Sequence, residues 1–186
     1  MRSVLDLSPV DFDYQVWNDP TGYDTLIRTY GPNRPAQEEP KEFTPELRAL
    51  VLENYETNVI SIAREHPETQ FYFVFPPGNM FFWDYVSRYG EFDQYLAAME
   101  TVIGEMLPLE NVRVFQFVDD ADKTEDLDRY KDRVHFDPAI MSEIISDVAA
   151  GRHEVTADTL ESTMQSVRDH WQNRDYDALY AGYTAE

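Results

Sequence analysis

The chain has 186 residues, of which 42% are hydrophobic and 14% aromatic, enough to bury the core of one folded domain. It carries 36 acidic and 15 basic residues. The resulting net charge of −21 disfavours nucleic acid and anionic membranes as partners, because contact with phosphate groups needs Lys and Arg. The absence of cysteine excludes disulfides and thiolate metal sites, and no apolar run has the length of a membrane span or the form of a signal peptide or anchor.

The first predicted element is a short strand over residues 3–7. Ser8 and Pro9 follow it and lead into a polar, aromatic loop. Ser8 therefore lacks the small neighbours of a nucleophile elbow and is expected to hydrogen-bond its local backbone. Residues 18–22, Asn-Asp-Pro-Thr-Gly, have the composition of a turn, and the Pro-rich residues 31–40 predict a surface connection.

A long helix is predicted over residues 44–65, with Thr44 as its cap and Pro45 at its first helical position. Apolar residues at helical spacing predict one buried face, formed by Leu47, Leu50, Val51, Tyr55, Val59 and Ile62. Asn54 and Asn58 fall in the middle of this face, and a buried asparagine needs hydrogen-bonding partners. Asn58 is interpreted either as bonding an adjacent loop or strand end or as a candidate substrate-binding residue.

Two apolar runs, residues 70–75 and 112–118, predict buried strands. The segment between them predicts helices over residues 80–89 and 92–106, so that the two strands form a right-handed parallel βαβ unit. Residues 76–79, Pro-Pro-Gly-Asn, stop the first strand at its carboxyl end, where open α/β sheets bind ligands. Asn79 is therefore a candidate for lining a substrate site.

The loop over residues 119–128 is strongly acidic, with carboxylates at Asp119, Asp120, Asp122, Glu125, Asp126 and Asp128. A calcium loop needs a glycine at its bend and a distal bidentate glutamate, and this loop has no glycine. We therefore predict a solvated acidic loop and no metal site. His153 and His170 also lack the spacing of a metal-binding pair.

Asp132 and His135 follow this loop, just before a predicted helix with Asp137 as its cap, Pro138 at its first position and Gly151 after its end. A carboxylate three residues before a loop histidine can accept the imidazole N–H and fix its tautomer. The other ring nitrogen is then free to act as a base. The alternative is an exposed histidine near a solvated aspartate.

A last amphipathic helix is predicted over residues 157–173, and its aromatic tail is expected to pack on the body or on a second chain. Residues 1–156 are interpreted as an α/β domain and residues 157–186 as a helix and tail packed on it. A sheet of three parallel strands has exposed edges, which seek partners. We therefore expect a second polypeptide or a homo-oligomer to complete the sheet, or the domain to be incomplete at its N-terminus.

Three blocks within residues 43–156 carry a family resemblance: FYFVFPPGNMFFWDYV, NVRVFQF and DLDRYKDRVHFDPAIMSEIISDVAAGRHEVT. Together they resemble the C-terminal half of SGNH (GDSL-like) hydrolases, most of all bacterial envelope proteins related to those that O-acylate alginate and teichoic acid. The resemblance implies a parallel three-layer α/β/α sheet of flavodoxin-like type. It also implies that Asp132 and His135 are the acid and base of a Ser-His-Asp triad.

The nucleophile block of that superfamily, a Gly-Asp-Ser on the first strand, is absent, and the resemblance would place that first strand upstream of Met1. Residues 16–19, Val-Trp-Asn-Asp, resemble the Gly-x-Asn-Asp block that supplies an oxyanion-hole asparagine, with valine in place of glycine. Asn18 is thus either part of a turn or a candidate substrate-binding residue.

The resemblance implies an esterase or O-acyltransferase domain for a bacterial cell-surface glycan or acyl ester, without a cofactor, and inactive alone because the serine is missing. As part of a longer protein it would work in the cell envelope. The alternative is a non-catalytic acidic binding or scaffold protein derived from the same fold. A mimic of nucleic acid would need carboxylates in rows on one face, whereas here they are scattered over loops and helices.

Overall fold

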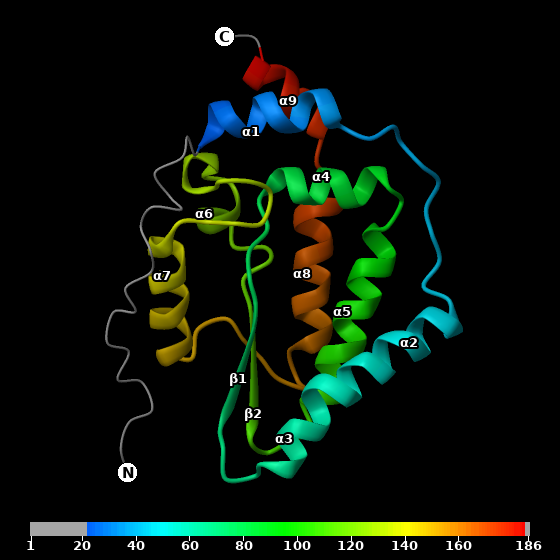
Figure 1. Ribbon diagram of the computed structural model, residues 1–186, viewed down its shortest axis with the longest axis vertical. Coiled ribbons are helices and arrows are strands. Elements are labelled where there is room, and N and C mark those ends of the chain that lie inside the picture. Colours follow the sequence, from blue (N-terminus) through cyan, green and yellow to red (C-terminus); the bar gives the residue numbers. More distant parts are fainter. Residues whose placement is uncertain (1–21, 185–186) are drawn as a thin grey trace.

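The computed structural model describes residues 22–184 (Figure 1). The predicted strand over residues 3–7, Ser8 and Asn18 all lie outside this range. Among the described residues, no helix is both long and apolar enough to span a membrane.

The sheet is small and mixed. Strands β1 (Phe71–Phe75) and β2 (Val112–Gln116) pair in parallel, with Phe71 opposite Val112 and Phe75 opposite Gln116. Strand β3 (Glu154–Val155) pairs antiparallel with the other side of β2. The α/β class and the parallel pair are therefore confirmed, whereas the third described strand is antiparallel.

The turn before β3 contains two residues with positive φ angles, Gly151 at +69° and His153 at +62°. It brings the chain to the side of β2 opposite β1, where the Gln116 N–H donates to the His153 carbonyl and β3 begins.

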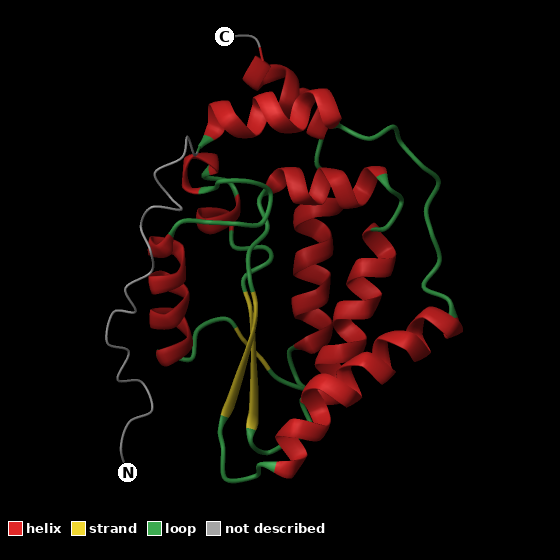
Figure 2. Ribbon diagram, viewed as in Figure 1, coloured by secondary structure: helices red, strands yellow, loops and turns green. Residues whose placement is uncertain are grey.

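Helices cover both faces of the sheet (Figures 1 and 2). Helices α5 (Phe92–Met106) and α8 (Leu160–Gln172) lie on one face, and α7 (Pro138–Ala149) lies on the other. Helix α4 (Met80–Arg88) crosses the carboxyl end of the strands. Trp83 of α4 stacks on Trp171 of α8 at 5.4 Å, and the Trp171 indole donates to the Val118 carbonyl, so these layers share one core.

The predicted helix over residues 44–65 forms as α2 (Pro45–Tyr55), a π-helical segment η3 (Glu56–Ile60) and α3 (Ser61–Glu65). The Thr44 side chain caps it by accepting the Leu47 N–H. The predicted buried face forms only in part. Tyr55 and Val59 pack partly buried against the core, whereas Leu50 is 62% and Ile62 is 44% exposed. Among the described side chains of this stretch, only Ile60 and Ala63 are fully buried. The π-helical turn changes the number of residues per turn, so Ile62, which follows it, is rotated away from the apolar positions that precede it. Leu50 lies before this turn, within α2.

The chain ends of the described region meet above α4. Helix α1 (Tyr23–Tyr30) and its extension η2 (Gly31–Asn33) lie beside α9 (Tyr176–Thr184) (Figure 1). Asp84 of α4 is 2% exposed and binds this layer by accepting hydrogen bonds from the Tyr30 hydroxyl and the Arg34 guanidinium. Arg88 contacts the same carboxylate at 3.1 Å. The cluster fixes α1 and the following loop on α4.

We expect Asp84→Ala to lower the free energy of unfolding by about 3 kcal/mol, because a buried hydroxyl loses its acceptor and two partly buried guanidinium groups keep only the exposed Asp177 as a carboxylate partner. Urea denaturation measures this loss. The control is Asp93→Ala, whose ion pair with Arg168 is exposed and contributes less than about 1 kcal/mol. Equal losses in the two variants would contradict the role given to Asp84.

Candidate functional site

The candidate site is a turn in which one carboxylate organises both the backbone and the ring of a histidine. Oδ1 of Asp132 accepts the backbone N–H groups of Val134 at 2.9 Å and of His135 at 2.8 Å. Its Oδ2 lies 2.6 Å from Nδ1 of His135. A hydrogen on Nδ1 makes this contact a hydrogen bond, which leaves Nε2 as the basic nitrogen. Nε2 has no hydrogen-bonding partner within residues 22–184.

These contacts favour the ionised form of the Asp132 carboxyl group. Partial burial raises the pKa of its carboxyl group, but the hydrogen bonds from the Val134 and His135 backbones and from the imidazole outweigh it and lower the pKa below its ordinary value. Asp132 is therefore ionised at neutral pH. An ionised partner stabilises the imidazolium that forms when Nε2 takes up a proton, which is what a general base requires.

Asn79 holds this turn in place through hydrogen bonds. It is fully buried at the junction of β1 and α4, where its Oδ1 accepts the Phe81 N–H and caps the helix. Its side-chain amide donates to the Asp132 carbonyl at 2.9 Å, and its backbone N–H donates to the Arg133 carbonyl at 3.0 Å. The sequence identified Asn79 as a substrate-lining candidate. The structure brings it to the Asp132 turn, where its polar atoms bind the protein itself.

Two further contacts hold the turn in place. The guanidinium of Arg133 lies 3.8 Å from the ring centroid of Tyr85 on α4. Tyr130 and Phe136 form an isolated antiparallel bridge, and the Lys131 N–H donates to the His135 carbonyl. Residues 130–136 are thus a short hairpin clamped on α4. The contact between Arg133 and Tyr85 has no sequence signal, because it depends on which helix lies beside the turn.

The other predicted site residues lie apart from this turn. Asn58 is exposed on η3 and donates to the Asn54 carbonyl within the same helical stretch. The prediction that Asn54 and Asn58 are buried is wrong. Asn58 lies within the π-helical segment, which rotates it out of the predicted face, whereas Asn54 lies before that segment in α2. Asn18 lies outside the described residues. The structure therefore unites Asp132, His135 and Asn79 and separates Asn58 from them.

The acidic loop is more ordered than predicted. It forms α6 (Ala121–Thr124) and η4 (Leu127–Arg129), and Lys123 is buried between Asp120 at 2.7 Å and Asp147 of α7 at 3.2 Å. Nε2 of His153 lies 3.6 Å from Asp120, so Asp120, Asp147 and His153 are close enough to hold a metal ion. The Lys123 ammonium already supplies the positive charge at these carboxylates, and the cluster is best explained as a structural ion pair.

Comparison of the chain with protein-family models, with curated proteins and with solved structures gave no match. The geometry of the Asp132 turn and the residues that carry the family resemblance are therefore the basis on which a function can be proposed.

We expect Asn79→Ala to lower the free energy of unfolding by about 2 kcal/mol or more, because the Asp132 carbonyl and the Phe81 N–H lose buried partners. The Nδ1 proton of His135 should also exchange faster with solvent in NMR spectra, since the turn loosens. Asn58→Ala is the matched control and should change stability by less than about 0.5 kcal/mol. Unchanged proton exchange in Asn79→Ala would contradict the supporting role.

The cluster of Lys123, Asp120, Asp147 and His153 predicts that the free energy of unfolding depends on pH in the acid range. Burial raises the pKa of Asp147, but hydrogen bonds from Arg152 and Lys123 outweigh it and hold the pKa below the ordinary 3.8. A carboxyl group whose pKa is lowered by folding stabilises the fold above its unfolded pKa and loses this effect as pH falls through the folded value. The stability difference between wild type and Asp147→Asn should therefore be present at about pH 5 and shrink below pH 3.8.

Urea denaturation across this pH range measures the difference. Asp122→Asn is the control, because Asp122 is exposed on the same short helix and makes no ion pair among the described residues. A difference for Asp147→Asn that persists unchanged at pH 2.5 to 3 would show that its charge is not the cause.

Proposed function

We propose that this chain provides the acid–base part of an SGNH-like esterase or O-acyltransferase that acts on a bacterial cell-surface glycan. The observation that carries the proposal is the 2.6 Å contact between Nδ1 of His135 and Asp132, with Nε2 of His135 left unengaged. The turn is bound to Asn79 at the carboxyl end of β1, and this is the end of a parallel sheet at which ligands usually bind. The three-residue spacing between Asp132 and His135 also agrees with the family resemblance.

In this proposal His135 is the general base and Asp132 orients it. Nε2 takes the proton from a serine hydroxyl while the serine oxygen bonds the ester carbonyl carbon, and the resulting imidazolium is stabilised by Asp132. The imidazolium then gives its proton to the leaving alcohol, which leaves an acyl-serine. Water completes an esterase cycle, and a sugar hydroxyl completes an acyl transfer. The serine comes from outside the described residues.

The second candidate function is a non-catalytic acidic binding or scaffold protein. The exposure of the pair favours it, since the side chain of His135 is 69% exposed and that of Asp132 is 52% exposed. Catalytic pairs normally work in sites that exclude water, where electrostatic stabilisation is strong. An enzyme therefore needs a covering segment or substrate over this turn, whereas a binding protein does not.

Labelling with a fluorophosphonate serine probe, together with hydrolysis of p-nitrophenyl acetate, distinguishes the two functions. For an enzyme, His135→Ala should lower turnover by about 10²–10⁴-fold, which is the usual contribution of a general base. His66→Ala is the matched control, because His66 is also exposed, with Nδ1 3.4 Å from Glu68, and should leave turnover unchanged.

The outcomes separate clearly. Labelling and turnover that both disappear in His135→Ala support the esterase, and Ser8→Ala then tests whether Ser8 is the nucleophile. Equal activity in wild type, His135→Ala and His66→Ala overturns the proposal and favours the binding protein. No labelling and no turnover at all means that this polypeptide is not an esterase by itself, and the serine must then be sought outside it.

A further inference from the structure

Strand β1 presents an open edge. The Phe71 N–H donates to the Asn111 carbonyl and the Phe75 carbonyl accepts from the Phe117 N–H, so both residues face β2. Backbone groups alternate in direction along a strand, and those of Tyr72 and Val74 therefore point away from β2. No strand within residues 22–184 pairs with this side. The edge thus offers two N–H and two carbonyl groups to an added strand.

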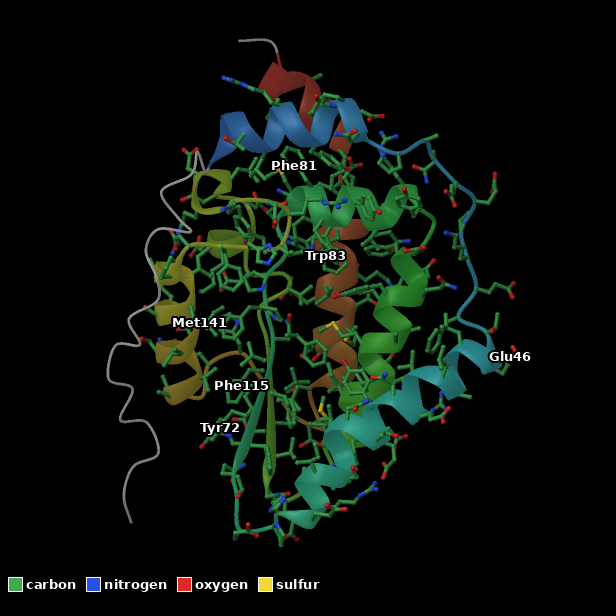
Figure 3. The ribbon with its side chains drawn as sticks, in the orientation of Figure 1. Glu46, Tyr72, Phe81, Trp83, Phe115 and Met141 are labelled. Carbon is green, nitrogen blue, oxygen red and sulfur yellow. The ribbon has the colours of Figure 1, made fainter. Side chains whose placement is uncertain are left out.

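The side chains beside this edge are apolar and partly uncovered. Tyr72 is 45% exposed and Val74 is 36% exposed. They lie on the same face as Phe115, which is fully buried, and Figure 3 shows Tyr72, Phe115 and Met141 on one side of the sheet. On the opposite face Phe71, Phe73 and Phe75 are only partly buried. An added strand would therefore meet apolar side chains on both of its faces.

Strand β1 also lacks the residues that usually prevent an edge strand from pairing with another chain. Natural edge strands carry lysine, proline or a bulge that prevents pairing with another chain. β1 reads Phe-Tyr-Phe-Val-Phe, with no charge and no proline, in a protein whose net charge is −21. Such a strand can pair along its open edge with a strand from another chain.

The charges around β1 indicate the chemistry of the strand that pairs with it. Glu65 and Glu68 are exposed just before its amino end. Arg113, on the same face as Tyr72, is already paired with Glu154. Basic residues that flank an added strand would complement Glu65 and Glu68, and the field of the whole protein, with a net charge of −21, would attract them.

We propose that the edge of β1 binds an extended segment of a partner polypeptide, with about five apolar, β-branched or aromatic residues flanked by Lys or Arg. Backbone hydrogen bonds to Tyr72 and Val74 provide the affinity, and the apolar side chains cover both faces of the edge. The proposal concerns a surface separate from the Asp132 turn and does not depend on an esterase activity.

The test uses the full chain and a fluorescein-labelled peptide, Lys-Lys-Val-Ile-Thr-Val-Phe-Lys-Lys, with binding measured by fluorescence anisotropy. The control peptide has proline in place of the central threonine, which prevents pairing as a regular strand. We expect binding of the first peptide alone, weakening as salt is raised, together with slower hydrogen exchange of the Tyr72 and Val74 amides.

Val74→Pro is the matched protein variant. Because the Val74 N–H points outward, proline removes an edge donor without removing a hydrogen bond to β2. It should weaken peptide binding about tenfold or more, whereas Leu50→Lys, which removes an exposed apolar side chain from α2, should leave it unchanged. Circular dichroism confirms that both variants are folded.

Three results would overturn the proposal. The first is equal binding of both peptides or no binding of either. The second is a dimer of the free chain that Val74→Pro dissociates, because the occupant is then a second copy. The third is slow exchange of the Tyr72 and Val74 amides in the monomeric chain without peptide, because residues of the same chain then cover the edge.

Discussion

The hydrogen bonds of Asn79 connect the main parts of this structure. One buried side chain caps α4 through the Phe81 N–H and binds the Asp132 carbonyl, while its backbone binds Arg133. The end of a core strand, the start of a helix and the Asp132 turn are therefore fixed to each other at one residue. A turn whose own side chains are solvent-exposed gains its rigidity from the buried amide beneath it.

Positive charge is scarce in this chain and much of it lies in partly or fully buried ion pairs. Arg34 and Arg88 share the buried Asp84, and Lys123 lies between Asp120 and Asp147. The first cluster attaches α1 and the following loop to α4, and the second attaches α6 to α7. Breaking such pairs leaves an uncompensated buried charge, so their main effect is to specify how these peripheral helices sit on the core.

The sequence predicted those features that depend on local patterns. Apolar runs located β1 and β2, and caps located α2 and α7, because these signals come from neighbouring residues. The pairing of Asp132 with His135 was also predictable from three-residue spacing. The supporting contacts of Asn79 and Arg133 were not, because they join residues about fifty positions apart and depend on how α4 lies across the sheet. The burial of Asn58 was predicted wrongly because a π-helical turn has no clear sequence signal.

The uncharged edge of β1 also affects how the protein behaves in solution. An exposed apolar edge favours self-association of identical chains, and a net charge of −21 opposes it by mutual repulsion. Repulsion between exposed charges acts over about 10 Å at 0.1 M salt and over only about 3 Å at 1 M. The acidic surface thus does at long range what a lysine or proline within β1 would do locally, and its effect on colloidal stability depends on ionic strength.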